Sequence, residues 1–589
     1  TCAGEFAAET PYFYSTSTKE NSENEAEKYL QELHNCNAKK DSSKGTILVL
    51  GSGPIRIGQG IEFDYASVQC VRALKNLGYE VAIVNNNPET VSTDFDTADR
   101  LYFEPLTPED VMNVIRTEKP IGVVAAFGGQ TAINLTKYLD SQKVPILGTS
   151  ADSIDLAEDR ERFEELCDSL GIKRPKGVTV FTEEEALEAA ARITYPVLLR
   201  PSYVLGGQNM IVARNSADVK EYMKIILRQK IENPVLIDKY MEGRELEVDC
   251  ICDGESVLIP GIMEHVERTG IHSGDSIAIY PGTFSLEMEE KIVKQSEALA
   301  LALRTKGLVN IQYLIYKDSE DKEDLYIIEA NPRSSRTVPY LSKVSGLPMV
   351  ELATRAMMGE KIRDMGFGTG LYRSPDYFAV KVPVFSFEKL MNVDTQLGPE
   401  MKSTGEVLGI AKTKEEALFK GFIAASWKTI RPKNFEEKNF VSAPTKEKKQ
   451  EEKGSSIPKG VLFSVRATDL PELPCLAKKF YDLGFALYAT SGNATTIKRS
   501  GMNVNYVAKV HENYKDNVMT LLESGKIAYI VSTSAKGRDP EAESVKLRRL
   551  AVEHDIDCLT AMDTANALAD SLASNFSEEN FSLVDIKKI

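Results

Sequence analysis

Residues 325–340, LYIIEANPRSSRTVPY, bring a carboxylate, an amide and two arginines together in one short stretch. The apolar run at its start predicts a buried strand. Glu329 and Asn331 are two apart, so on an extended chain they point the same way and can present oxygens to one hard cation such as Mg2+. Arg333 and Arg336 follow, and guanidinium groups bind phosphate or carboxylate oxygens bidentately. A strand that ends in a solvated charged turn fits the same four residues equally well.

A second candidate strand, residues 309–314, supplies a further oxygen. Its sequence is VNIQYL, and Gln312 could join Glu329 and Asn331 if the two strands pair. Residues 317–324 between the strands are mostly acidic and polar, which indicates the exposed tip of a hairpin. The sequence therefore predicts a β-hairpin that positions the metal ligands.

Composition limits what kind of protein this is. A chain of 589 residues is too long for one core and suggests roughly three to five domains. The hydrophobic fraction of 42% and the charged fraction of 27% are those of a soluble globular protein. No apolar run reaches the length of roughly 18 residues that a membrane span needs. The formal charge of −16 argues against a nucleic-acid partner bound through a general basic face.

The cysteines and the amino terminus indicate the compartment. Eight cysteines are scattered without a CxxC pair, which is typical of reduced thiols in a cytoplasmic protein rather than of disulfides or a zinc site. The chain starts with TCAGEF, without Met, signal peptide or transit segment. We therefore expect it to be a piece of a longer protein.

The first folded unit reads as a doubly wound α/β domain. Residues 1–44 are polar and are interpreted as the end of a preceding domain plus a linker. A strand at 46–50, the turn GSGPIRIGQG, a helix at 65–77 and a strand at 80–85 follow. The glycine spacing does not match GxGxxG, and the chain has no GxxxxGK[ST] phosphate loop. Any ATP site must be built in another way.

Two later segments suggest phosphate contacts. Gly206 and Gly207, in RPSYVLGGQNM, suit a flexible flap whose amides can cover phosphates, although an ordinary hairpin is the alternative. Residues 435–459, rich in Lys and Glu, predict a linker. Beyond them a small α/β domain carries hydroxyl residues after successive strands, which suits either a phosphate pocket or ordinary helix caps. His265 and His272 lie in the polar stretch 261–276, and the sequence assigns neither a role.

The motifs taken together resemble the carboxy-terminal half of the large subunit of bacterial-type carbamoyl phosphate synthetase. They are GSGPIRIGQGIEFDY, NNNPETVSTDFDTADRLYFEP, RPSYVLGGQNM, EHVERTGIHSGDS, EANPRSSRTVPY and LGPEMKSTGEV. The resemblance covers essentially the whole chain and implies a multidomain α/β protein. The implied organisation is the end of an oligomerisation domain with a linker (1–44), a Rossmann-like pre-ATP-grasp domain (45–149), an ATP-grasp domain (150–434), a linker (435–459) and a methylglyoxal-synthase-like allosteric domain (460–589).

The resemblance also implies a reaction and partners. In that family the second ATP-grasp half phosphorylates carbamate with MgATP to give carbamoyl phosphate, which serves pyrimidine and arginine biosynthesis. The implied partners are the amino-terminal half of the large subunit and a glutaminase small subunit, in an oligomeric enzyme without nucleic acid or membrane. The implied cofactors are ATP and two Mg2+ or Mn2+ ions, with K+ as a candidate further ion.

The family's nucleotide residues match positions in this chain. They are Arg160, Arg200, Lys239, Met241, Glu245, Gly270, Ile271, His272, Ser273, Gln312 and Glu329. By this resemblance the two arginines contact phosphates, whereas Lys239, Met241 and Glu245 hold the adenine and ribose. Glu247 is the alternative to Glu245, because the alignment there is ambiguous by a residue or two.

The resemblance likewise implies the catalytic residues. Gln312, Glu329 and Asn331 match metal ligands, and Glu329 also counts as catalytic. Arg333 and Arg336 match residues that face the transferred phosphoryl group and carbamate. The chemistry then consists of positioning and charge neutralisation in a site that excludes water.

The terminal domain matches the family's allosteric site only in part. Thr490, Lys509 and Thr533 match its nucleotide monophosphate pocket. The expected threonine, lysine and asparagine are replaced, so the effector is not identified; the replacements are Asn493, Leu470 and Ser532. A further set matches positions that bind ornithine in some members, namely Glu267, Asp275, Glu400 and Thr560.

Two alternatives to this enzyme stay open. One is another ATP-grasp ligase, such as a biotin-carboxylase-like enzyme, although no biotin-carrier segment is present. The other is a regulatory and oligomerisation module that binds nucleotide without turnover. Metal-dependent turnover would separate these possibilities.

Overall fold

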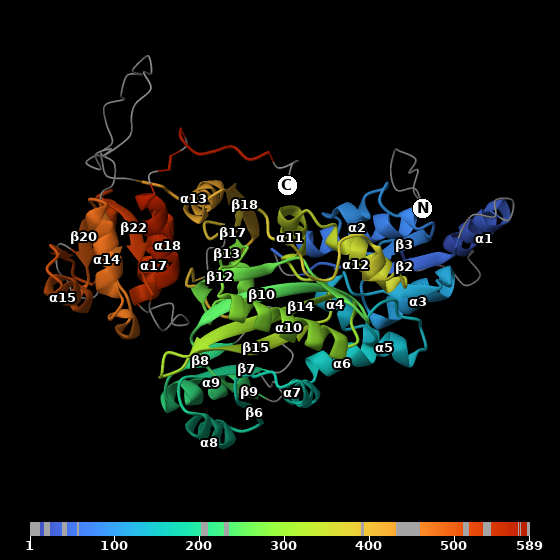
Figure 1. The fold of residues 1–589 in the computed structure, drawn as a ribbon, viewed down its shortest axis with the longest axis horizontal. Coiled ribbons are helices and arrows are strands. Elements are labelled where there is room, and N and C mark those ends of the chain that lie inside the picture. Colours follow the sequence, from blue (N-terminus) through green and yellow to red (C-terminus); the bar gives the residue numbers. More distant parts are fainter. Residues whose placement is uncertain are drawn as a thin grey trace, which may run out of the picture.

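A computed structural model describes most of the chain, and its arrangement is drawn in Figure 1. The described residues are 12–16, 24–37, 44–55, 58–201, 210–228, 235–389, 394–430, 460–509, 517–533, 543–574, 576–577 and 579–585. The predicted flap glycines Gly206 and Gly207 and the predicted linker 435–459 lie outside these residues. In Figure 1 the amino-terminal sheet and the terminal domain lie at opposite ends, with a large sheet between them.

The amino-terminal sheet is parallel, in the order β1-β4-β3-β2-β5. Its strands are β1 (Tyr12–Phe13), β2 (Thr46–Leu50), β3 (Glu80–Val84), β4 (Arg100–Tyr102) and β5 (Gly122–Val124). Its helices include α1 (Glu25–Asn37), α2 (Gly60–Asn76), α3 (Pro108–Glu118), α4 (Gly129–Ile133) and α5 (Thr136–Ser141). The helix expected at 65–77 therefore starts earlier, at Gly60. Because β1 pairs with β4, the sheet extends across the predicted boundary at residue 44, and that boundary stays a prediction.

A nine-stranded sheet forms the centre of the molecule. Its main order is β15-β14-β10-β12-β13-β17-β18, with β11 on β10 and β16 on β11. The strands are β10 (Arg244–Asp253), β11 (Val257–Ile259), β12 (Ile262–Arg268), β13 (Ala278–Tyr280), β14 (Lys306–Lys317), β15 (Glu323–Asn331), β16 (Gly370–Leu371), β17 (Phe378–Val384) and β18 (Gly405–Ala411). The predicted hairpin is confirmed, because β14 and β15 pair antiparallel around the exposed tip at residues 318–322.

Strand β10 shows why one face of this sheet became polar. Leu246, Val248 and Cys250 are buried in the apolar cluster that includes Ile292 of helix α10 (Leu286–Ala302). Since side chains alternate along a strand, the intervening carboxylates point to the opposite face. The sequence ELEVD thus turns its apolar residues to α10 and its acids away from that helix.

A smaller antiparallel sheet, β6-β9-β7-β8, lies beside the central one. It comprises β6 (Gly177–Val180), β7 (Val197–Pro201), β8 (Ile211–Ala213) and β9 (Val235–Lys239), with helices α8 (Glu183–Ile193) and α9 (Ser216–Arg228). Thr182 and Glu185 form a capping box at the start of α8, as the sequence TEEE favours. Val197, Leu199 and Ile237 belong to this subdomain's own apolar core, which leaves the alternate residues of β7 and β9 on the other face.

Other helices join the first two domains. They are α6 (Ala151–Glu158), α7 (Arg160–Ser169), α11 (Val338–Ser345) and α12 (Met349–Met357). Helix α12 packs on α2, and residues of both helices share one apolar cluster. Among the described helices, none combines the length and apolar character needed to cross a bilayer.

The terminal domain is a parallel sheet in the order β21-β20-β19-β22-β23. Its strands are β19 (Gly460–Phe463), β20 (Ala486–Ala489), β21 (Asn505–Tyr506), β22 (Ile527–Val531) and β23 (Asp557–Leu559). Its helices are α14 (Leu473–Asp482), α15 (Ser491–Arg499), α16 (Val518–Glu523), α17 (Glu543–Glu553) and α18 (Met562–Ala573). Helix α13 (Lys414–Ala424) packs on α18, and one apolar cluster holds both Phe422 and Leu568. This shared core joins the terminal domain to the central sheet.

Candidate active site

The predicted metal ligands lie side by side on two paired strands. Gln312 of β14 is the register partner of Glu329 on β15. Asn331 Nδ2 donates to Glu329 Oε1 at 3.0 Å, and Gln312 Nε2 donates to Ser273 Oγ at 3.4 Å. The carboxylate and the two amides therefore gather at one end of the hairpin, where their oxygens suit Mg2+.

Strand β10 extends this polar face with carboxylates. Glu247 is the register partner of Gln312, so Glu247, Gln312 and Glu329 form a row across three strands. Asn310 Nδ2 donates to Glu247 Oε1 at 2.7 Å and to Asp249 Oδ1 at 3.1 Å. Both acids are buried, so the amide of Asn310 partly offsets the cost of removing them from water.

Burial shifts the pKa values of acids on strand β10. It raises the pKa of Glu245 to about 7; nearby His265 acts against this, while the charges of Glu247 and Glu329 add to it. Burial, with the charge of Glu247, raises the pKa of Asp249 to about 7. His265 Nε2 lies 3.6 Å from Glu247 Oε2, and neither ring nitrogen of His265 has a hydrogen-bond partner among the described residues. This face of the sheet therefore holds buried polar atoms that lack a hydrogen-bond partner among the described residues.

Arg333 is held next to the predicted metal ligand Asn331. Its Nη2 donates to Asn331 Oδ1 at 3.2 Å and its Nε to Gln130 Oε1 at 3.3 Å. The guanidinium lies 5.9 Å from the centroid of the Phe63 ring. Burial lowers the pKa of Arg333, although nearby carboxylates including Glu329 oppose this.

Arg336 is held more loosely by polar groups. Its Nη1 donates to Met401 Sδ at 2.9 Å, and its Nη2 lies 3.8 Å from Glu62 Oε1. Nε and Nη2 are buried, and within the described part of the chain neither has a hydrogen-bond partner. A Cβ on Gly274 would lie 1.8 Å from Nη1, so only glycine permits this approach. Arg336 therefore has donors that suit an anion.

The two predicted phosphate arginines meet on the smaller sheet. Arg160 Nη2 donates to Asp238 Oδ1 at 2.7 Å, and Arg200 Nε donates to Asp238 Oδ2 at 3.2 Å. Arg160 is at the first turn of α7, whose N-cap is Asp159. Asp238 is the residue that brings the arginines together.

The expected adenine and ribose residues follow at the connection between the two sheets. Lys239 Nζ donates to the carbonyl oxygens of Thr194 and Tyr195, at 3.0 and 3.2 Å. The carbonyl of Met241 accepts from Thr269 Oγ1 at 2.7 Å. This connection is thus tied both to the smaller sheet and to the end of β12.

Residues 270–273 pass along the same region. Gly270 has φ +107°, and a Cβ there would lie 2.7 Å from Tyr240 Oη. His272 Nδ1 accepts from the Gly274 amide at 3.0 Å, so this nitrogen acts as a local acceptor. Ser273 contacts Gln312, as above, and Ile271 is half-buried. The structure brings this segment to the metal-ligand hairpin.

The predicted allosteric residues lie at one edge of the terminal sheet. Thr490, Lys509 and Thr533 each come just after a parallel strand, and carboxyl ends of parallel strands share an edge. Lys509 Nζ is 3.7 Å from Glu543 Oε2, and Thr533 Oγ1 accepts from the Arg466 amide at 3.2 Å.

The side chain of the replacement residue Asn493 already has hydrogen-bond partners within the terminal domain. Its Oδ1 accepts from the Val465 amide at 2.9 Å, and its Nδ2 donates to the Val465 carbonyl at 3.1 Å. These bonds use one acceptor site and one N–H of the amide and tie the Asn493 side chain to the backbone of Val465. The departure at Asn493 therefore changes the chemistry of the edge.

The residues that match ornithine positions lie toward the terminal domain. Glu267 Oε1 accepts from Thr564 Oγ1 at 2.6 Å, and Thr560 Oγ1 accepts from the Leu397 amide at 3.2 Å. Asp275 accepts from the amides of residues 402 and 403, both at 2.8 Å. Glu400 is half-buried in the same loop.

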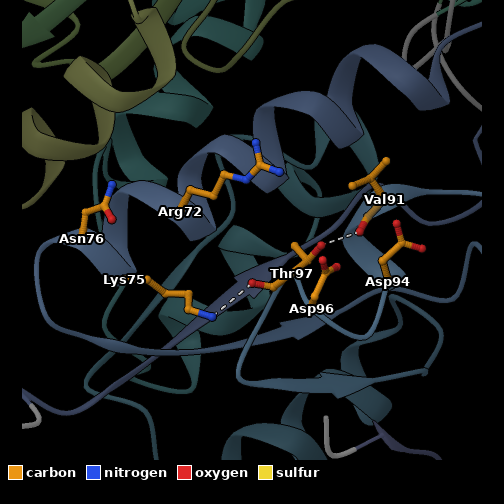
Figure 2. Close-up of a pocket in the computed structure, with 7 residues that line it drawn as sticks. All are labelled: Arg72, Lys75, Asn76, Val91, Asp94, Asp96 and Thr97. Atoms are coloured by element: carbon orange, nitrogen blue, oxygen red, sulfur yellow. Dashed lines mark hydrogen bonds between the residues drawn. The ribbon is translucent and has the colours of Figure 1, made fainter. Parts of the chain in front are cut away.

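A separate small cavity of about 300 Å³ lies on the amino-terminal domain (Figure 2). It is lined by Arg72, Lys75, Asn76, Val91, Asp94, Asp96 and Thr97. Lys75 Nζ donates to the Thr97 carbonyl at 3.4 Å. None of the predicted site residues lines this cavity. Across the described residues no group of three or more His, Cys, Asp or Glu suits a metal ion, whereas the hairpin set relies on two amides.

Sequence reasoning overlooked several residues of the site. Asp238, Asn310 and Thr337 received no role, yet Thr337 Oγ1 donates to Asp249 Oδ2 at 2.7 Å. The alternation of acids in ELEVD was the available signal for the β10 carboxylates. Asp238 and Asn310 gave no such signal, because their partners are far away in the sequence.

Three family models match consecutive parts of the chain. The carbamoyl phosphate synthase preATP-grasp domain matches residues 43–156. The carbamoyl-phosphate synthase L chain ATP binding domain matches residues 159–365. The MGS-like domain matches residues 472–560. These matches confirm the predicted domain types.

Curated relatives agree with the family models. The carbamoyl phosphate synthase large chain of Lachnoclostridium phytofermentans is 50% identical over 590 aligned residues, covering 100% of this chain and 51% of that protein. The large chain of Clostridium botulinum is 47% identical over 587 residues, again covering 100% and 51%. The chain therefore spans about half the length of the curated relatives it matches.

Solved structures give a weaker likeness. The biotin carboxylase domain of Hydrogenobacter thermophilus 2-oxoglutarate carboxylase, crystallised with MgADP and bicarbonate, is 19% identical with a TM-score of 0.49, covering 63% of this chain and 87% of that one. The family assignment rests on the closer sequence relatives. The chain belongs to the carbamoyl phosphate synthase large-chain family and corresponds to the carboxy-terminal half of those proteins.

Proposed function

We propose that this chain phosphorylates carbamate with MgATP, giving carbamoyl phosphate and ADP. The observation that carries the proposal is the hairpin set of Gln312, Glu329 and Asn331 beside Arg336, whose buried Nε and Nη2 have no hydrogen-bond partner among the described residues. In a member of this family, such a set suits a metal-bound phosphate and an anionic acceptor.

The residues of the hairpin would hold the metal. Glu329 supplies the negative charge, and the amide oxygens of Gln312 and Asn331 complete a set that suits Mg2+ or Mn2+. When bound, the metal neutralises charge on the transferred phosphoryl group. The pairing of β10, β14 and β15 keeps Glu247, Gln312 and Glu329 in register across three strands.

The arginines would hold the reacting groups in line. Arg336 Nε and Nη2, which no described residue accepts from, would donate to the carboxylate of carbamate or to the phosphoryl oxygens, and Asn331 and Gln130 hold Arg333 near the same place. A carboxylate oxygen of carbamate attacks the γ-phosphorus, and the bond to the β–γ bridging oxygen breaks as ADP leaves. No covalent enzyme intermediate is needed.

The smaller sheet would bind the nucleotide. Arg160 and Arg200 converge on Asp238 and could exchange that carboxylate for phosphate oxygens. By the family resemblance, Lys239, Met241 and the buried Glu245 would hold the adenine and ribose. We further propose that residues 270–273 line the nucleotide, as their contact with Gln312 through Ser273 favours.

The wider assignments are part of this proposal. The partners would be the amino-terminal half of the large subunit and a glutaminase subunit, within pyrimidine and arginine biosynthesis. Mn2+ in place of Mg2+, a K+ ion, an oligomer, and a nucleotide monophosphate at Thr490, Lys509 and Thr533 are expectations from the family resemblance.

The decisive experiment is the reverse reaction, ATP formation from MgADP and carbamoyl phosphate. The complete protein that contains this sequence is compared with its Glu329→Gln variant, which keeps the size of the side chain but removes the charge. We expect ATP formation to fall by about 100-fold or more, because the metal loses its charged ligand. Removing divalent metal with EDTA should abolish it in the wild type.

Glu323→Gln is the matched control. Glu323 lies on the same strand at its exposed end, 3.9 Å from Lys317, so its replacement should leave turnover unchanged. Wild-type protein that binds MgADP yet forms no ATP would contradict the proposal and favour a silent nucleotide-binding module. Equal loss in both variants would contradict the role of Glu329.

A further inference from the structure

Residues 394–404, called here the bridging loop, connect the terminal domain to the candidate active site. Asp394 at the start of the loop is held by Arg548 of α17, with Nε–Oδ1 at 2.8 Å and Nη2–Oδ2 at 2.7 Å. The Arg548 side chain is 0% exposed and that of Asp394 13%. Three residues on, the Leu397 amide donates to Thr560 Oγ1. The loop is thus fixed to the terminal domain at two points.

The bridging loop is also braced internally. Lys402 Nζ donates to the carbonyl oxygens of Asp394 at 2.7 Å and Gln396 at 2.6 Å. The Gln396 amide donates to Asp394 Oδ1 at 3.2 Å. Because one ammonium group binds both carbonyls, the start and the end of the loop are held together. Asp394 and Lys402 are therefore linked directly across the loop.

The far end of the loop contacts the candidate active site. The Gly398 carbonyl accepts from the His272 amide at 2.8 Å, and the amides of Lys402 and Ser403 donate to the Asp275 carboxylate. Met401 between them is 1% exposed, and its sulfur accepts from Arg336 Nη1 at 2.9 Å. Gln59 Nε2 donates to the same sulfur at 3.1 Å, and the loop thus supplies one polar contact to the Arg336 guanidinium.

We propose that Arg548 is a positioning residue for the phosphoryl-transfer site: it holds Asp394, the bridging loop carries that constraint to Met401, and Met401 places the Arg336 guanidinium. Arg548 touches no substrate in this account. A bidentate pair fixes the direction as well as the distance of its carboxylate, which a single hydrogen bond does not. The terminal domain is then a structural part of the catalytic unit. This inference rests on the function proposed above.

The test uses the reverse reaction in the complete protein that contains this chain, with variants Arg548→Gln, Arg548→Lys and Asp394→Asn. We expect Arg548→Gln to lower kcat/KM for carbamoyl phosphate by about tenfold or more, because small misplacements of a binding group are costly in transfer reactions. The Kd for MgADP should rise by a smaller factor than kcat/KM falls, because Arg160, Arg200 and Lys239 lie outside the loop even though the loop holds the His272 amide. Arg548→Lys keeps the positive charge but loses the planar fork of the guanidinium. Its kcat/KM should therefore lie between those of wild type and Arg548→Gln.

Arg549→Gln is the matched control. Arg549 is the next residue on α17 and its Nε lies 3.6 Å from Glu553 Oε1, so its loss should leave both constants unchanged. General unfolding would weaken MgADP binding together with turnover, which separates it from a positioning effect. If Arg548→Gln does not fold, Asp394→Asn carries the test, since it removes the buried charge without changing size. A folded variant whose kcat/KM stays within about twofold of wild type overturns the proposal.

The loop is also tested without turnover, by trypsin cleavage after Lys402. Release of Asp394 should expose this bond and raise the cleavage rate in the folded variants by about tenfold, because local opening controls proteolysis. An unchanged rate overturns the positioning role. If the wild type forms no ATP, the proposed function fails, whereas the cleavage rates still decide whether Arg548 sets the loop.

Discussion

At the border between the central sheet and the terminal domain, charged side chains are closely paired, whereas on the hairpin face several buried polar groups have no hydrogen-bond partner in the part of the chain that the structure describes. Arg268 shows the first pattern: it donates to both oxygens of Asp563 and both oxygens of Glu472, over 2.7 to 2.9 Å. Arg336 shows the second, with two buried donors that no described residue accepts. Both arginines bear the same charge.

The difference follows from what each region must do. Buried polar atoms without partners cost free energy, so a fold retains them where a ligand completes the set. Paired charges at a border instead fix two domains relative to each other. Under the proposed function, the contrast is between residues that bind substrate and residues that stabilise the structure, and three changes would break or sharpen it.

The largest effect is expected from Arg336→Lys. Lysine keeps the positive charge but loses the planar fork, so it cannot serve an anion with two parallel donors. We expect kcat for ATP formation from MgADP and carbamoyl phosphate to fall about 100-fold, which corresponds to about 2.7 kcal/mol. The unfolding midpoint should stay within a few degrees of wild type.

Arg363→Lys is the control for that change. Arg363 Nη2 lies 2.9 Å from Glu255 Oε2 in an exposed pair remote from the hairpin, so turnover should not change. Loss of stability rather than turnover in Arg336→Lys would mean that its unpartnered donors are structural. The contrast between the two regions would then be wrong.

A smaller effect is expected from Arg268→Gln at the border. The change leaves Asp563, Glu472 and Glu242 without their shared cation, so like charges face one another. Because the Arg268 side chain is 34% exposed, we expect a loss of about 2 kcal/mol of unfolding free energy rather than the larger cost of a fully buried pair.

Urea unfolding measures this loss, and MgADP binding serves as the reference that should not move. Lys478→Gln, which breaks the exposed pair with Asp482 on α14, should cost no more than about 0.5 kcal/mol. If Arg268→Gln proves as mild as this control, the paired charges do not stabilise the border.

The smallest effect concerns pH and Glu267. Burial raises the pKa of Glu267 from 4.5 to about 7, against the hydrogen bonds from Thr564 and the Ile277 amide. Between these two values the folded protein binds a proton that the unfolded chain releases, so this carboxyl contributes stability at low pH that is lost as pH rises through 7. The Glu267→Gln substitution removes this pH-dependent contribution to the free energy of unfolding.

We therefore expect the stability of Glu267→Gln relative to wild type to be higher at pH 8 than at pH 6.5 by about 1 kcal/mol. Urea unfolding at the two pH values measures the difference. Replacement of Glu290, which is exposed on α10, by Gln should leave the pH dependence unchanged. A Glu267 variant with the wild-type dependence would show that the buried carboxyl does not titrate in this range.

Local patterns in the sequence predicted much of this protein, because they arise between near neighbours along the chain. Alternation and apolar runs predicted β2, β3 and the β14–β15 hairpin. The hairpin also predicted that Glu329, Asn331 and Gln312 lie together, since pairing across one short turn fixes their register. The domain types followed from long motifs, and the family models confirm them.

Tertiary structure alone decided the contacts between distant segments. β1 joined the amino-terminal sheet across a predicted boundary, because a strand of two residues has no periodicity to detect. Asp238 unites Arg160 with Arg200, and Arg548 binds Asp394 across 154 positions of sequence. Such pairs depend on where whole domains pack, and no local spacing encodes that. The sequence determined which residues are candidates for the chemistry, and packing determined which of them have hydrogen-bond partners among the described residues.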